Sequence, residues 1–138
     1  MSAELATVFL YSLQANELEA QITNNLESVN AAQKYSSNEV AQIHLEANCE
    51  EDMIRNEIAA LDDQTGDEYE DLMDEIRELK EEVDDKVEVV ENRMSDFETN
   101  IQLENDRLEA QLEHCNQNHD AYKELAIQNA QDNAGYFQ

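Results

Sequence analysis

Apolar side chains recur every three or four residues along most of the chain. In the second half they form a stripe from Leu72 to Ala126, with polar residues at two stripe positions, Glu104 and His119. The stripe advances 54 residues, from 72 to 126, in fifteen steps. The mean step of about 3.6 is the period of an α-helix. The second half is therefore predicted to be one long amphipathic helix.

The stripe departs from a strict seven-residue repeat where two four-residue steps follow one another. These places are Leu79-Val83-Val87 and Glu104-Leu108-Leu112. Such stutters locally unwind a left-handed supercoil. We therefore expect long, nearly straight helices with weak coiling.

The first half carries a weaker stripe, from Leu5 to Leu61. Between Ala31 and Ala47 it consists largely of alanine and small polar residues. Small side chains let backbones approach closely but bury little apolar area. We expect a third helix, from another subunit, to complete the packing along this segment.

One interior turn signal separates the halves, the run Asp-Asp-Gln-Thr-Gly-Asp-Glu at residues 62–68. Thr65 and Glu68 have the spacing of a capping box around Gly66, with Thr65 as the N-cap of the following helix. A single helix that continues through Gly66 in a parallel dimer is the alternative, because an interior glycine costs only about 1 kcal/mol. The capping box and the matched lengths of the halves favour a bend.

The predicted fold class is therefore all-α, a long antiparallel, coiled-coil-like hairpin that assembles with other copies. We place the first helix at about 3–62, the bend at about 62–66 and the second helix at about 66–131. A short C-terminal tail follows, and the whole chain, 1–138, is one domain. In this register the numbers of facing residues sum to about 130.

The composition agrees with few turns and long helices. The chain of 138 residues has no proline, no tryptophan and two glycines, while 41% of residues are hydrophobic and 30% charged. Turns are rich in glycine and proline, so the scarcity of these two residues leaves few places for the chain to reverse.

The formal net charge is −26, and the residues from Glu50 to Glu75 contribute twelve acids against one base, Arg55. This charge excludes nucleic acid as a partner. It also opposes self-association unless salt, cations or a basic protein surface screen it. The partners we expect are other copies of the chain, with a basic protein surface or screening cations as further candidates.

The first thirteen residues contain an apolar run with no Lys or Arg before it, unlike a signal peptide. The run is too short to span a bilayer. We expect a protein without a membrane span that is cytoplasmic, or secreted without a cleaved signal peptide.

Large apolar residues near both chain ends cover more than one face of their helices, which indicates burial by other chains. A hairpin brings these two ends together, away from the acidic bend. The predicted self-assembly interface consists of Leu5, Val8, Phe9, Leu10, Tyr11, Leu13, Tyr122, Leu125, Tyr136 and Phe137. The predicted bend residues are Thr65, Gly66 and Glu68.

No residue pattern predicts catalysis, a cofactor or a specific metal site. An EF-hand with Gly66 at position six would place Leu61 and Leu72 at ligand positions, and neither side chain can bind Ca²⁺. Cys115 and His119 lie four residues apart beside His114, but they fall on the apolar stripe and predict core packing. We expect a protein that is not an enzyme.

The leading hypothesis is a structural, self-assembling subunit of a helical filament or extracellular appendage. With its paired helices, apolar ends and acidic bend, the chain resembles the helical-hairpin subunits of type III secretion needles and filaments in general plan. The resemblance implies terminal helices packed toward the filament centre and export without a cleaved signal. The chain lacks the proline-containing turn of needle proteins. The alternative is a small acidic adaptor, scaffold or secretion chaperone that holds a partner helix or a basic surface.

Overall fold

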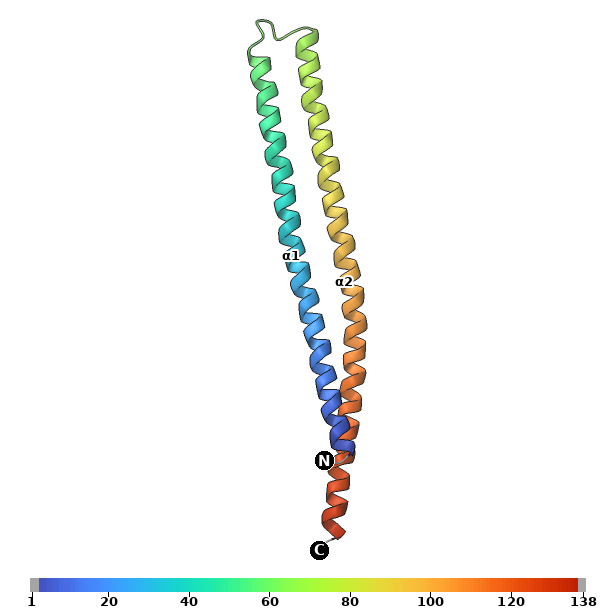
Figure 1. Cartoon of the computed structure of the whole chain (residues 1–138). Helices are drawn as coiled ribbons and strands as arrows, with labels where there is room; N and C mark the ends of the chain where they lie inside the picture. The colour runs from blue at the N-terminus through green and yellow to red at the C-terminus, as the bar shows by residue number, and fades with distance from the viewer. Residues whose placement is uncertain (1–2, 137–138) are drawn as a thin grey trace. The chain divides into compact units, whose positions relative to one another are not determined.

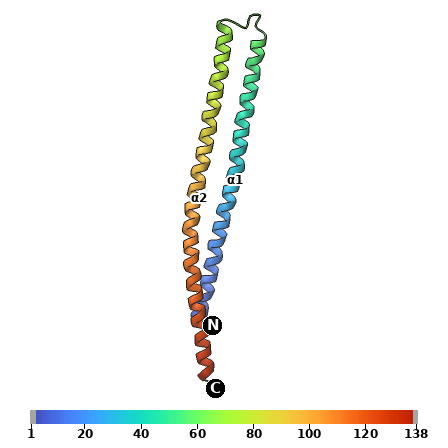
Figure 2. The same ribbon diagram turned by 180° about the vertical axis from the view of Figure 1, so that it is seen from behind.

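The computed structural model describes residues 3–136 as two helices joined by a short loop (Figure 1). Helix α1 is Ala3–Ala59 and helix α2 is Asp67–Tyr136, and the described residues contain no strand. The helices pack against each other in opposite directions, which confirms the predicted hairpin (Figure 2). α1 ends at Ala59 rather than near 62, and α2 continues to Tyr136 rather than to about 131.

Contacts between the helices divide the chain into two units of 69 residues each. The terminal unit joins α1 up to Val29 with α2 from Thr99 onward, and the bend unit is Asn30–Glu98. Both units keep the predicted register. The hydrogen-bonded pair Asn25–Asn105 lies in the terminal unit and the pair Ser36–Met94 in the bend unit. Each pair of residue numbers sums to 130, as expected.

The terminal unit is a regular two-helix seam. On α1 its less exposed positions alternate steps of four and three residues: Tyr11, Ala15, Leu18, Ile22, Asn25 and Val29. This alternation is a heptad repeat, which keeps one face of α1 turned toward α2. Leu18, Leu108 and Cys115 form the centre of the seam, and Leu108 is only 1% exposed.

The repeat of the bend unit is interrupted on both helices. Less exposed positions follow one another in four-residue steps at Ala32-Ser36-Val40 on α1 and Leu79-Val83-Val87 on α2. The second of these runs confirms the stutter predicted there. Small side chains occupy two of the three α1 positions, so this part of the bend unit buries little apolar area.

The second predicted stutter is misplaced. Glu104 is exposed, and the stripe passes instead through Asn105, which is 3% exposed. The two consecutive four-residue steps therefore run from Phe97 through Ile101 to Asn105, and the steps from Asn105 through Leu108 to Leu112 are three and four residues. Asn105 and not Glu104 lies in the seam, because the amide of Asn105 has a hydrogen-bond partner on α1.

The predicted capping box is wrong. The Gly66 carbonyl accepts the first helical hydrogen bond, from Glu70 N–H at 3.0 Å, so Gly66 is the N-cap of α2. Its φ of 118° is a conformation that suits glycine. The Thr65 hydroxyl donates to Asp63 Oδ1 at 2.7 Å, and Thr65 N–H donates to the same oxygen at 3.0 Å. Asp63 therefore organises the bend as an Asx turn, and Glu68 lies in the first turn of α2.

Candidate assembly surfaces

Tyr11 belongs to the seam within the chain. Its ring lies 5.8 Å from that of Tyr122, with 32° between the ring planes, and its carbonyl oxygen accepts a hydrogen bond from the Cys115 thiol at 3.2 Å. The Cys115 sulfur also lies 3.8 Å from Gln14 Oε1. These contacts confirm core packing for Cys115, and the paired residue numbers, 126 and 129 in sum, agree with the predicted register of about 130.

A row of apolar side chains lies on the face of α1 that points away from this seam. Leu5, Phe9 and Leu13 are 49%, 59% and 45% exposed, and their four-residue spacing aligns them in one row that we call the ridge. Phe9 is nine residues from the buried Leu18, which at about 100° per residue places it on the opposite side of the helix. The ridge is thus available to a partner while α1 remains packed on α2.

The other residues of the predicted interface differ in position. Leu10 is 63% exposed and Leu125 is 46% exposed, whereas Val8 is half-buried. The side chain of Tyr136 and all of Phe137 lie outside the described residues. The exposed part of the predicted interface is therefore centred on the ridge.

A polar pair interrupts the apolar seam of the terminal unit. Asn105 Oδ1 accepts a hydrogen bond from Asn25 Nδ2 at 2.9 Å. Within the described residues, no buried side-chain nitrogen or oxygen lacks a hydrogen-bond partner. A shifted register would leave both amides without this bond, at the cost of an unsatisfied buried group. The pair therefore specifies the register, and sequence reasoning missed it although the two numbers sum to the predicted 130.

A groove of about 700 Å³ opens between α1 and α2 in the bend unit. It coincides with the small-residue segment where the sequence predicts incomplete packing. Across the groove, the Ser36 hydroxyl donates a hydrogen bond to the sulfur of Met94 at 3.5 Å. The apolar lining comes from Val40, Val90 and Met94, and the serine lining from Ser36, Ser37 and Ser95.

The two units differ in charge. The terminal unit has eleven acids and two bases, a formal charge of −9, whereas the bend unit has 23 acids and six bases, a formal charge of −17. Ion pairs offset a small part of the bend unit's charge. One of them joins Arg93 on α2 to Glu39 on α1.

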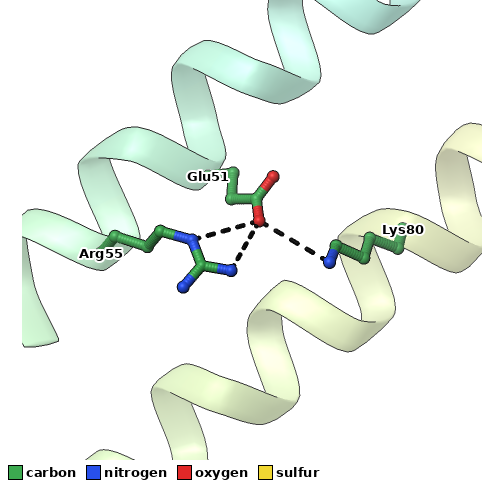
Figure 3. A network of polar contacts seen from close by, with 3 residues as sticks. All are labelled: Glu51, Arg55 and Lys80. Atoms are coloured by element: carbon green, nitrogen blue, oxygen red, sulfur yellow. Dashed lines mark hydrogen bonds and ion pairs between the residues drawn. The ribbon is translucent and has the colours of Figure 1, made fainter.

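Glu51 is the centre of a second cross-helix contact (Figure 3). Its Oε1 lies 2.9 Å from Arg55 Nη2 and 3.2 Å from Arg55 Nε on the same helix, and 3.7 Å from Lys80 Nζ on α2. The hydrogen bond from Arg55 lowers the pKa of the Glu51 carboxyl, and the charge of Lys80 lowers it further. Because these groups face water, the contact contributes little to stability.

The histidines near Cys115 make local contacts. His114 Nε2 lies 3.3 Å from Asn118 Nδ2, and His119 Nδ1 lies 3.4 Å from Asp120 Oδ1. Across residues 3–136 no group of three His, Cys, Asp or Glu side chains is placed to hold a metal ion. No helix in the described part of the chain has the length and apolarity needed to cross a bilayer.

Comparison of the chain with models of protein families, with curated proteins and with solved structures gave no match.

Proposed function

We propose that the chain is a structural, self-assembling coiled-coil subunit of a helical filament or extracellular appendage. The observation that supports this proposal is the ridge, a row of three large apolar side chains turned away from the intramolecular seam. Seven apolar side chains are buried among residues 3–136, a small core for two helices of 57 and 70 residues. Long helices depend on packing for stability, and further copies supply it.

The charge distribution favours contacts between copies that involve the terminal unit. Contact between two bend units brings together surfaces of −17 each, whereas the terminal unit carries about half that charge and the ridge. Association therefore begins at a terminal unit. Salt at about 0.15 M shortens the reach of the remaining repulsion to about 8 Å, so assembly increases with ionic strength.

Light scattering and negative-stain microscopy of the purified protein across a salt series test the proposal. We expect regular polymers whose mass rises with salt. Phe9→Asp abolishes them because it places a charge in the centre of the ridge, while circular dichroism shows unchanged helicity. Met53→Asp is the matched control, because Met53 is 66% exposed on the same helix in the bend unit. Discrete dimers or tetramers at every salt concentration would contradict the proposal.

The acidic surface of the bend unit supports a second candidate, a small adaptor, scaffold or secretion chaperone that binds a basic partner. Binding by such an adaptor depends on salt in the opposite way to polymerisation, because salt screens the attraction between unlike charges and weakens the complex. Binding to a basic helical peptide, measured by fluorescence anisotropy at rising salt, distinguishes the candidates. An adaptor loses the peptide with salt and forms no polymer, while a filament subunit polymerises as salt rises.

A further inference from the structure

The ridge and the groove have the same length. The ridge runs eight residues along α1, from Leu5 to Leu13, and the α2 side of the groove runs eight residues, from Val90 to Glu98. At 1.5 Å per residue each is about 12 Å long. A helix that lays the ridge into the groove therefore spans the groove along its α2 side.

The charges around the two surfaces also suit each other. The segment 3–16 has a single charged side chain, Glu4, so it approaches an acidic surface with little repulsion. On its α1 side the groove is lined by uncharged residues, Gln33, Ser36, Ser37 and Val40, and Lys34 and Glu39 lie between them in sequence. Glu91 and Glu98 line the α2 side, where the partial positive charge of a helix N-terminus is favourable.

We propose that the ridge of one copy docks in the groove of the next copy. This inference rests on the proposed self-assembly and names its contact. The ridge lies on α1, and one side of the groove is formed by the same helix. A helix cannot pack on itself, so a ridge that fills the groove comes from a second copy. The contact joins two different surfaces, so a copy that docks its ridge can still accept the ridge of another copy in its groove. Such a heterologous contact continues into an open helical polymer unless its rotation closes a ring.

Variants of each surface test the contact separately. Phe9→Asp disables the ridge, and Phe9→Asn removes the ring without adding charge. Ser37→Phe fills the groove from an exposed position, and Asn38→Phe adds the same ring at the next residue, which does not line the groove. We expect either disabled surface to raise the concentration needed for polymerisation about tenfold or more, and Asn38→Phe to leave it unchanged.

A mixture of the Phe9→Asp and Ser37→Phe variants tests the contact most directly. Phe9→Asp retains its groove, and Ser37→Phe retains its ridge. An equimolar mixture therefore forms a complex of two chains that cannot grow, measured by sedimentation velocity, although each variant alone remains a single chain. Circular dichroism of each variant checks that its helices are intact.

The failures of the two proposals can be told apart. If wild type polymerises and Phe9→Asp blocks it but Ser37→Phe does not, the groove is not the acceptor and only this inference is overturned. A mixture that stays monomeric overturns it equally. If the wild-type chain forms no polymer at any salt concentration, both the proposed function and the inferred contact fail.

Discussion

The terminal unit and the bend unit contain the same number of residues but use them differently. The terminal unit has a heptad seam centred on Leu18, Leu108 and Cys115, and an apolar row on its outer face. The bend unit has small residues on α1, interrupted heptads, a groove and a charge of −17 against −9. Of the seven apolar side chains buried among residues 3–136, four lie in the terminal unit and three in the bend unit, so the units differ less in the size of their cores than in the regularity of the seam and in charge.

Core truncation has the largest expected effect and tests whether the terminal seam carries the stability. Leu108→Ala should lower the free energy of unfolding by about 2–4 kcal/mol, because it leaves a cavity at the least exposed side chain. Leu103→Ala on the same helix, 63% exposed, should change it by about 0.5 kcal/mol or less. Val90→Ala in the bend unit should cost about 1–2 kcal/mol, since fewer methyl groups are lost beside an open groove. Urea unfolding followed by circular dichroism measures all three.

Equal losses from Leu108→Ala and Val90→Ala would remove the distinction between the units. A large loss from Leu103→Ala would mean that this exposed side chain is covered by another copy.

The asparagine pair has the next largest expected effect. Asn105→Ala should cost about 1–2 kcal/mol, because it leaves the half-buried Asn25 amide without its hydrogen-bond partner. The double variant Asn25→Leu/Asn105→Leu replaces both amides with apolar side chains and should recover this loss, but it removes the polar register signal. Urea unfolding of the single and double variants measures the coupling.

Sedimentation velocity then checks the specificity of the double variant. We expect it to populate more than one associated state at salt concentrations where wild type gives one distribution. A single distribution identical to wild type would show that the apolar steps alone set the register.

The smallest expected effect concerns the Glu51 ion pair of the bend unit. The pKa of the Glu51 carboxyl is lowered in the folded chain from its ordinary value of about 4.5. The stabilising contribution is therefore present above that ordinary value and is lost as pH falls through the lowered pKa. Glu51→Gln should therefore melt slightly below wild type at pH 7 and converge with it as pH falls through the lowered pKa of the Glu51 carboxyl. Glu57→Gln removes the same charge outside this pair, so the difference between the variants isolates it. A difference that persists at low pH would assign the effect to packing.

The sequence was sufficient for the two helices, the hairpin and the register. Local spacing of apolar residues determines which face of each helix is buried, and matched halves around a glycine favour a reversal. The stutter at Leu79-Val83-Val87 follows from the same spacing, as does the incompletely packed segment that contains the groove. These features follow from spacings and lengths along the chain, which a sequence displays directly.

Features that depend on a partner were harder to predict. From Ile101, both Glu104 and Asn105 lead to Leu108 in allowed steps, so spacing alone cannot choose between them. The choice depends on Asn25, which is distant in sequence but opposite in space. The predicted cap failed for a similar reason, because the Thr65 hydroxyl has a nearer acceptor in Asp63.

The two free thiols allow the opening of the hairpin to be measured by chemical labelling. Cys49 is exposed, whereas Cys115 is 3% exposed in the terminal seam. An alkylating reagent should therefore label Cys49 at the rate of an open thiol and reach Cys115 only when the seam separates. The slow phase of labelling then reports how often α1 leaves α2 around Cys115, and the measurement needs no engineered probe. Its rate in single chains and in polymers would measure how far each added copy holds the two helices closed.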